Sequence, residues 1–256
     1  MNRVDGKVAL VTGGGAGIGR ATCKVLAKAG AKIVVSGRNI DSVEETAQMI
    51  TQSGGEAVAI KLDVSSEADW QNAIDFTLAR FKKLNILVNN AGIYTMENFE
   101  EVSLASWRKV MSINFDGVFL GIRAAILAMK DNEETNSIIN ISSTGGLRPY
   151  QDVPYCSAKG GMKNLTKCAA IECRKKGYKI RVNTLYPGAI KDGMLKEVKE
   201  TEEYSREFLS QYPTVDRIGE ALDMAKGILF LASEDSSYIT GTDLVIDGGL
   251  LLDTKH

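Results

Sequence analysis

Short apolar runs rich in β-branched residues recur along the chain and alternate with longer amphipathic stretches. Examples are Ile33–Val35, Ile86–Val88 and Ile138–Ile141. Strands of a parallel sheet have this near-continuous apolar character because helices cover both faces of the sheet. The pattern predicts strands at residues 7–12, 32–36, 56–62, 84–90, 136–142, 179–185 and 242–247, with helices between most of them. This alternation indicates βαβ units and an α/β fold with a parallel sheet of about seven strands.

The alternation runs through the chain without a repeat, a low-complexity segment or a linker rich in proline and serine. A chain of 256 residues is long enough for one large α/β core. We therefore expect a single domain over residues 1–256, with functional residues gathered at the carboxyl ends of the strands.

A glycine-rich turn joins the first predicted strand, Lys7–Thr12, to the helix after it. This glycine turn (residues 13–19) contains Gly13, Gly15, Ala16, Gly17, Ile18 and Gly19. Glycines let the backbone approach a pyrophosphate closely, and a helix N-terminus offers N–H donors and a positive dipole end. The turn predicts an anion-binding site, although Ile18 stands where the dinucleotide fingerprint has glycine. A tight turn without a ligand is the alternative.

Any acid/base chemistry in this sequence falls to tyrosine, lysine or a carboxylate, because histidine is nearly absent. The single histidine is the terminal residue His256, which is a poor candidate for a catalytic triad or a zinc site. Tyr155 and Lys159 stand four residues apart and would share one face of a helix opened by Pro154. Because a nearby cation favours the phenolate, we expect Lys159 to lower the pKa of Tyr155. A solvated helix face carrying the same pair is the alternative.

Composition and charge argue against several classes of function. The net charge of −1 gives no indication of binding to nucleic acid or a membrane surface, and no apolar run is long enough to predict a membrane span. The N-terminus enters a strand without a signal-peptide pattern, so we expect a cytoplasmic protein. Cys23, Cys156, Cys168 and Cys173 lack metal-ligand spacing, so no metal site is expected.

A series of short motifs stands in a fixed order along the chain. They are Thr12–Gly19, Asp63–Val64, Asn89–Gly92, Asn114, Ser142, Tyr155–Lys159 and Pro187–Gly188. In these motifs, over essentially its whole length, the sequence resembles the short-chain dehydrogenase/reductase family. The resemblance implies a doubly wound, Rossmann-like parallel sheet with helices on both faces. It also implies hydride transfer between a nicotinamide and an alcohol/carbonyl pair, and a homotetramer.

The resemblance implies a role for each residue of the catalytic motifs. Tyr155 would be the general acid of carbonyl reduction and the base of alcohol oxidation, and Lys159 would lower its pKa and hold the nicotinamide ribose. Ser142 would hydrogen-bond the substrate oxygen, and Asn114 would complete a proton relay. An asparagine inside the long helix predicted over residues 103–129 is costly unless its amide replaces backbone partners or holds a water. A polar residue on a helix surface is the alternative.

The same resemblance implies a site for a nicotinamide cofactor. Beyond the glycine turn, Tyr155 and Lys159, this site would use Asp63, Val64, Asn90, Ala91, Gly92, Pro187, Gly188 and Ile190. Asp63 would face the adenine edge, or would serve only as an acid ahead of a helix. Ile190 would contact the nicotinamide ring through its backbone, because the threonine that relatives usually carry nearby is absent.

Residues after the second predicted strand favour NADP(H) over NAD(H). Gly37 occupies the place where NAD-preferring relatives carry aspartate, so no acidic side chain there binds the ribose 2′-hydroxyl. Arg38 can pair with a 2′-phosphate through its planar guanidinium. Ala16 stands where many NADP-using relatives carry a second basic residue, so NAD(H) stays an alternative.

The charged and amphipathic pattern of residues 189–217 predicts that this segment is a substrate lid. The lid's apolar residues near helical spacing are Met194, Leu195, Val198, Phe208, Leu209 and Tyr212. An apolar wall of Tyr94, Met96, Leu147, Tyr150 and Tyr186 would add to the site. We therefore expect a small hydrophobic ketone or secondary alcohol as substrate, with ordinary core packing as the alternative.

Two other functions stay open. A 3-oxoacyl-thioester reductase of fatty-acid synthesis would dock an acidic carrier protein, for which Lys130 and Arg174 are candidates. The acidic residues Asp131, Glu133 and Glu134 oppose such a partner. An NADP-binding sensor without catalysis would not need the full set of reactive side chains.

Overall fold

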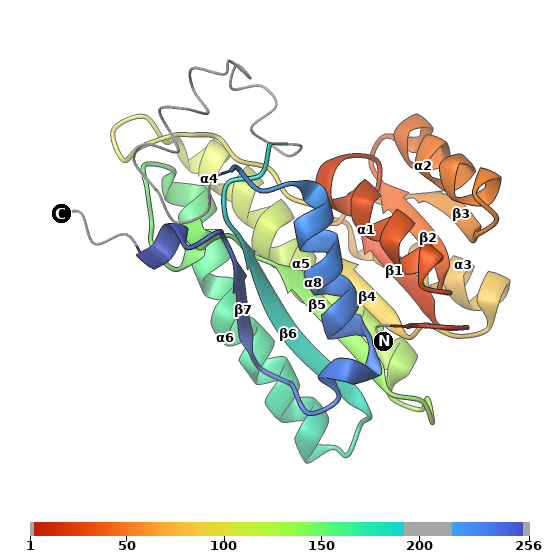
Figure 1. Cartoon of the computed structure of the whole chain (residues 1–256). Helices are drawn as coiled ribbons and strands as arrows, with labels where there is room; N and C mark the ends of the chain where they lie inside the picture. The colour runs from red at the N-terminus through yellow and green to blue at the C-terminus, as the bar shows by residue number, and fades with distance from the viewer. Residues whose placement is uncertain (1–2, 192–216, 253–256) are drawn as a thin grey trace.

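The computed structural model describes residues 3–191 and 217–252, and these form one parallel sheet between two layers of helices (Figure 1). The strands are β1 (Val8–Thr12), β2 (Lys32–Gly37), β3 (Glu56–Lys61), β4 (Ile86–Asn89), β5 (Asn136–Ile141), β6 (Ile180–Pro187) and β7 (Asp243–Ile246). They pair in the order β3-β2-β1-β4-β5-β6-β7, and every pairing is parallel. The predicted α/β fold is confirmed, and each predicted strand lies within two residues of the observed one at both ends.

Helices cover both faces of the sheet. One face packs against α1 (Gly17–Lys28), α2 (Ile40–Gln52) and α8 (Ala221–Ala232), and the other against α3 (Glu67–Phe81), α5 (Gly117–Met129) and α6 (Val153–Lys175). Successive strand residues alternate between the faces, so Leu10 joins the core under α3 and Val11 the core under α1. Short helical turns are η2 (Thr144–Gly146), η4 (Glu234–Ser236) and η5 (Leu250–Leu252).

The order of the strands brings two loops together. The chain builds the sheet outward from β1 in one direction through β3 and then returns to place β4 on the other side of β1. In doubly wound sheets, ligands bind at the carboxyl ends of the strands where the winding direction changes. Here that point lies between β1 and β4, so the glycine turn meets the loop after β4.

The long helix predicted over residues 103–129 is present but not uniform. It consists of α4 (Leu104–Met111), the π-helical turn η1 (Ser112–Asp116) and α5. By length and composition alone, Leu104–Met129 could cross a membrane. However, 44% of its most apolar window is buried, and α5 packs against α3, β4, β5 and α6. Packing inside the fold therefore accounts for its apolar character.

Candidate active site

The glycine turn is packed so closely that side chains would not fit at several of its positions. Gly13 has a φ of +64°, and a Cβ on Gly14 would lie 2.6 Å from Val35 Cγ1. A Cβ on Gly19 would overlap the Gly13 carbonyl, and one on Gly15 would overlap the Ser42 hydroxyl. Among the residues that the structure describes, no side chain caps the N-terminus of α1, which begins directly after Ala16. The turn thus presents bare backbone at a helix N-terminus, which fits the pyrophosphate of a dinucleotide.

The loop after β4 braces this turn. The Asn90 Nδ2 donates to the Thr12 carbonyl at 2.9 Å, and the backbone N–H groups of Asn90 and Ala91 donate to Thr12 Oγ1 at 2.9 and 3.0 Å. The Asn90 side chain therefore supports the glycine turn, whereas Ala91 and Gly92 line the neighbouring pocket.

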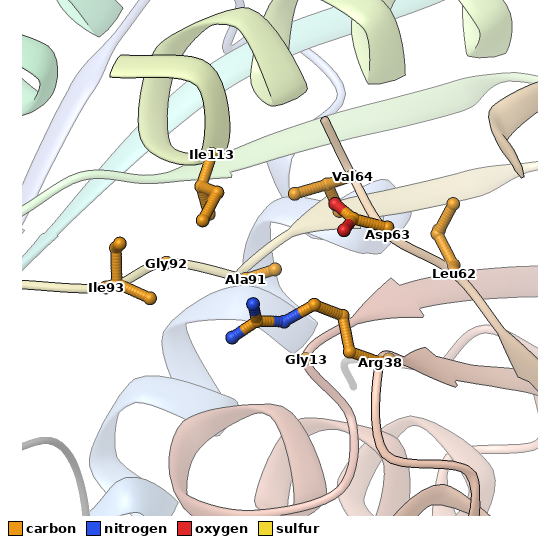
Figure 2. Close-up of a pocket in the computed structure, with 10 residues that line it drawn as sticks. Gly13, Arg38, Leu62, Asp63, Val64, Ala91, Gly92, Ile93 and Ile113 are labelled. Carbon is orange, nitrogen blue, oxygen red and sulfur yellow. The ribbon is translucent and has the colours of Figure 1, made fainter. Parts of the chain in front are cut away.

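A pocket opens at the carboxyl ends of β1, β2, β3 and β4 (Figure 2). It is lined by Gly13, Gly37, Arg38, Leu62, Asp63, Val64, Ala91, Gly92, Ile93 and Ile113. Figure 2 shows the Arg38 side chain extending into the pocket from the end of β2. Sequence analysis did not single out Leu62, Ile93 and Ile113 for this site, although each is adjacent in sequence to a predicted site residue. Their position next to predicted site residues is the sequence feature that could have identified them as pocket residues.

Asp63 makes local hydrogen bonds ahead of α3 and also lines the pocket. Its Oδ1 accepts from the backbone N–H and the hydroxyl of Ser65 at 2.9 and 2.6 Å, in the turn that precedes α3. The same carboxylate lines the pocket opposite Arg38. The Ser65 hydroxyl, with a smaller effect of Arg38, holds the pKa of Asp63 below its usual value.

Tyr155 and Lys159 lie on one face of α6, as their spacing predicted. Asp152 caps this helix by accepting from the Tyr155 N–H at 3.2 Å, and Pro154 lies in its first turn. The Lys159 Nζ lies 5.6 Å from the centroid of the Tyr155 ring. Both side chains are buried, with 8% of Tyr155 and 3% of Lys159 exposed, so this is not a solvated helix face.

Burial dominates the acid/base properties of the pair. It raises the pKa of Tyr155 to about 12, although a hydrogen bond with the Ser143 side chain opposes this rise. It lowers the pKa of Lys159 to about 7, and Lys159 Nζ donates to the Ile141 carbonyl at 2.8 Å. The expected lowering of the Tyr155 pKa by Lys159 is therefore not seen, because desolvation is the largest influence on this pKa and the hydrogen bond that opposes it comes from Ser143.

The serine beside Tyr155 is not the one predicted. The Ser142 hydroxyl donates to the Lys159 carbonyl at 2.9 Å and is buried against α6. Ser143 instead is hydrogen-bonded to the side chain of Tyr155. Successive residues after a strand point in different directions, and the sequence offers two adjacent serines without indicating which one faces the site.

Asn114 uses its amide to replace backbone partners, one of the two possibilities expected. Its Oδ1 accepts from the Ile93 N–H at 2.8 Å, and its Nδ2 donates to the Ile93 carbonyl at 2.7 Å. The residue is fully buried within η1, so it is not a polar residue on a helix surface. It anchors the chain directly after Gly92 to the π-helical turn.

The structure describes the region after β6 only in part. Pro187 is the last residue of β6, and the Gly188 N–H donates to the Ile246 carbonyl at 3.0 Å. Ile190 pairs with Gly219 through the Ala189 carbonyl and the Lys191 N–H, and its side chain is buried. This pairing does not use the backbone groups of Ile190. Residues 192–216 of the predicted lid, with its apolar residues, lie outside the described residues.

The apolar wall needs one correction. Tyr186 is fully buried and its hydroxyl donates to Asp243 at 3.1 Å, so it is a core residue and not part of a substrate wall. Tyr150 does lie beside the site, with its ring centroid 6.3 Å from that of Tyr155. Tyr150 is 48% exposed and Met96 56% exposed.

The two basic residues considered for carrier-protein docking lie far from this site. Arg174 is in the last turn of α6 and Tyr155 in its first turn, and a 23-residue helix is about 35 Å long. Lys130 follows the C-terminus of α5 at the same edge of the sheet, where Glu134 pairs with Lys7 and Lys83 at 3.0 and 2.6 Å. Neither basic residue is near Tyr155.

Comparisons with known proteins agree with this geometry. A family model described as "Enoyl-(Acyl carrier protein) reductase" matches residues 13–251. The chain is 40% identical over 249 residues, 97% of each protein, to the 2,5-dichloro-2,5-cyclohexadiene-1,4-diol dehydrogenase LinX of Sphingobium indicum. It is 39% identical over 251 residues to the NADP-dependent (R)-specific alcohol dehydrogenase of Lentilactobacillus kefiri, covering 97% of this chain and 98% of that one.

A solved structure shows the same architecture. The crystal structure of a short-chain type dehydrogenase/reductase from Mycobacterium marinum matches with a TM-score of 0.91 and 32% identity, covering 98% of both chains. Sequence motifs, fold and full-length relatives agree, and the chain belongs to the short-chain dehydrogenase/reductase family as an NAD(P)-dependent oxidoreductase.

Proposed function

We propose that the protein interconverts a ketone and a secondary alcohol with NADP(H), using Tyr155 as the general acid and base. One observation carries this proposal. Tyr155, Lys159 and Ser143 meet at the start of α6, at the same edge of the sheet as the glycine turn and its neighbouring pocket.

The side chains around Tyr155 support a role in proton transfer. When bound, the nicotinamide supplies or accepts the hydride at the substrate carbon. At neutral pH Tyr155 carries its proton, because its pKa is about 12, so it can donate to the oxygen of a carbonyl under reduction. In our proposal the Ser143 hydroxyl hydrogen-bonds that oxygen as negative charge develops on it. Lys159 binds the nicotinamide ribose, and burial of the pair excludes water.

Arg38 supports the choice of NADP(H). Its guanidinium lines the pocket beside Gly37, where an acidic side chain would be expected in an NAD-binding site. One relative is named as NADP-dependent, which favours the same cofactor. NAD(H) remains the alternative, because Ala16 leaves the glycine turn without a second basic residue.

We further propose a small, hydrophobic secondary alcohol, such as a ring alcohol, as the substrate. The two relatives are named for a chlorinated cyclohexadiene diol and for (R)-specific alcohol oxidation. The partly exposed side chains of Tyr150 and Met96 offer apolar surface beside Tyr155. Residues 189–217 are the proposed lid over this site.

The proposal includes a cytoplasmic homotetramer in which residues 1–256 form one domain, without nucleic-acid or membrane partners. The support for assembly is apolar surface on the outer elements of the fold. Leu127 on α5, Ile171 on α6, Leu222 on α8 and Val245 on β7 are all exposed. Sedimentation of the purified protein checks the tetramer.

A second candidate function is reduction of a 3-oxoacyl thioester. The description of the matching family model favours it, since that description names an acyl-carrier-protein reductase. The positions of Lys130 and Arg174 do not, because these residues lie at the opposite edge of the sheet from Tyr155. A sensor without catalysis is the least favoured, because the reactive side chains are assembled.

The test is consumption of NADPH and NADH, followed at 340 nm, with cyclohexanone, an aryl ketone, a steroid ketone and an acetoacetyl thioester. We expect turnover of the free ketones, with NADPH preferred. Activity confined to the thioester would establish the second candidate instead. Tight NADPH binding without any turnover across the panel would support the sensor.

A further inference from the structure

Asp152 is a buried carboxylate that the proposed mechanism does not use. Its exposed fraction is 0%, and it precedes α6, three residues before Tyr155. Within residues 3–191 and 217–252 the Asp152 carboxylate forms no salt bridge. It accepts hydrogen bonds from backbone N–H groups and from one hydroxyl. A buried carboxylate without a cation is costly unless such donors surround it.

The two carboxylate oxygens join two separate parts of the chain. Oδ2 accepts from the backbone N–H groups of Thr95 and Met96 at 3.1 and 2.9 Å. Oδ1 accepts from the Tyr155 N–H at 3.2 Å and from the Thr95 hydroxyl at 3.3 Å. Asp152 therefore ties the loop after β4 to the first turn of the helix that carries Tyr155.

These contacts exceed what a helix cap requires. Asn39, Ser66 and Ser103 cap α2, α3 and α4 with one side-chain oxygen each, which accepts from a single backbone N–H. A serine or an asparagine would cap α6 equally well, because one acceptor is enough. An ionised carboxylate has two oxygens, and both of them only accept hydrogen bonds. One oxygen can therefore bind the helix N-terminus while the other binds the loop.

The tied loop has a backbone conformation that needs support. Met96 has a φ of +57°, which is uncommon for a residue other than glycine and persists where the surroundings hold it. Its N–H is one of the groups that Asp152 binds. The Val153 N–H adds a second link between the same two segments by donating to the Glu97 carbonyl at 3.0 Å.

We propose that Asp152 is a positioning residue. It holds residues 94–96, which form one wall of the substrate site, in a fixed position relative to Tyr155. The inference rests on the proposed function, in which the substrate lies between this wall and the Tyr155 hydroxyl. If the tie is lost, the wall moves relative to Tyr155 and the substrate binds less well. If the cap is lost as well, Tyr155 itself moves and proton transfer slows.

Two variants separate the tie from the cap. Asp152→Ser keeps a hydroxyl that caps α6 but is too short to reach Thr95 and Met96, and Asp152→Ala removes both functions. For Asp152→Ser we expect KM for cyclohexanone to rise about tenfold with kcat within about threefold of the wild type. For Asp152→Ala, kcat should fall as well, so serine rescues kcat but not KM.

A control variant tests for a merely structural role. Asn132→Ala, at the opposite edge of the sheet, removes hydrogen bonds to the Leu84 carbonyl and to Asn136 at 2.8 and 2.9 Å. It should destabilise the protein without changing KM. If both Asp152 variants alter KM and kcat no more than this control does, the positioning role is wrong.

Amide hydrogen exchange gives a readout that needs no turnover. In Asp152→Ser the N–H groups of Thr95 and Met96 should exchange at least about tenfold faster, with the Tyr155 N–H unchanged. Equal protection at residues 95 and 96 in the variant and the wild type would refute the tie. If the wild type reduced no ketone, the proposed function would fail, and the exchange result would still decide whether Asp152 holds the loop.

Discussion

The Ser142 hydroxyl donates a hydrogen bond to the Lys159 carbonyl at 2.9 Å, and this contact turns it away from Tyr155. Ser143, one residue later, is hydrogen-bonded to the Tyr155 side chain. The two adjacent serines therefore have different surroundings. Ser142 joins β5 to α6, and Ser143 faces the reacting groups of the proposed mechanism.

Ser143→Ala should lower kcat/KM for ketone reduction by about 10²-fold to 10³-fold, as expected when one hydrogen-bond donor to a developing oxyanion is removed. The matched variant Ser142→Ala should retain most of the activity and instead lower the free energy of unfolding by about 1 kcal/mol. Steady-state kinetics and urea unfolding of both variants check this. The reverse order of activities would restore Ser142 as the substrate-binding serine.

Tyr155→Phe should abolish turnover while NADPH binding stays nearly unchanged, because the substitution removes only the hydroxyl that donates the proton. Fluorescence titration with NADPH and the assay at 340 nm measure the two properties separately. Tyr178→Phe, beyond the far end of α6, is the control for loss of a phenol elsewhere. Substantial turnover by Tyr155→Phe would remove this residue from the mechanism.

Arg38→Ala should raise KM for NADPH about tenfold to a hundredfold, because a charge-assisted hydrogen bond to a phosphate is worth about 1.5 to 3 kcal/mol. KM for NADH should change little, since NADH has no 2′-phosphate. Arg80→Ala is a suitable control, because Arg80 lies in the last turn of α3 and pairs with Glu56 at 3.7 Å. An equal rise for both cofactors would mean that Arg38 does not bind the 2′-phosphate.

Lys159→Met should abolish activity and yet stabilise the protein near neutral pH. In the folded protein the pKa of Lys159 falls to about 7 from its usual 10.5, so the unfolded chain binds more protons between these values. The resulting destabilisation is fully present below about pH 7 and is lost as the pH rises toward about 10.5. The methionine variant should therefore gain about 2 to 4 kcal/mol at low pH, after loss of the hydrogen bond to Ile141.

Urea unfolding of wild type and Lys159→Met at several pH values measures this difference. The stability gap should close as the pH rises. A gap that does not depend on pH would show that burial does not set the pKa of Lys159.

Much of the fold could be predicted from the sequence, because it depends on local patterns. Apolar runs such as Ile33–Val35 have the composition of buried parallel strands. Their alternation with helical stretches predicted the parallel pairing that the structure shows. Part of the glycine turn has a local steric cause, since a Cβ on Gly19 would overlap the Gly13 carbonyl within the same turn. Tyr155 and Lys159 are four residues apart, so the helical repeat alone places their side chains on one face of α6.

The tertiary structure decided what depends on residues distant in the sequence. The direction in which the chain leaves β5 places the Ser142 hydroxyl against the Lys159 carbonyl and Ser143 against the Tyr155 side chain. Tertiary contacts also joined Asn114 to Ile93 and Asp152 to Met96. The tertiary structure also set the pKa directions of Tyr155 and Lys159, because burial is a property of the folded chain. Local sequence specifies which groups are available, whereas packing specifies which of them meet and how much water reaches them.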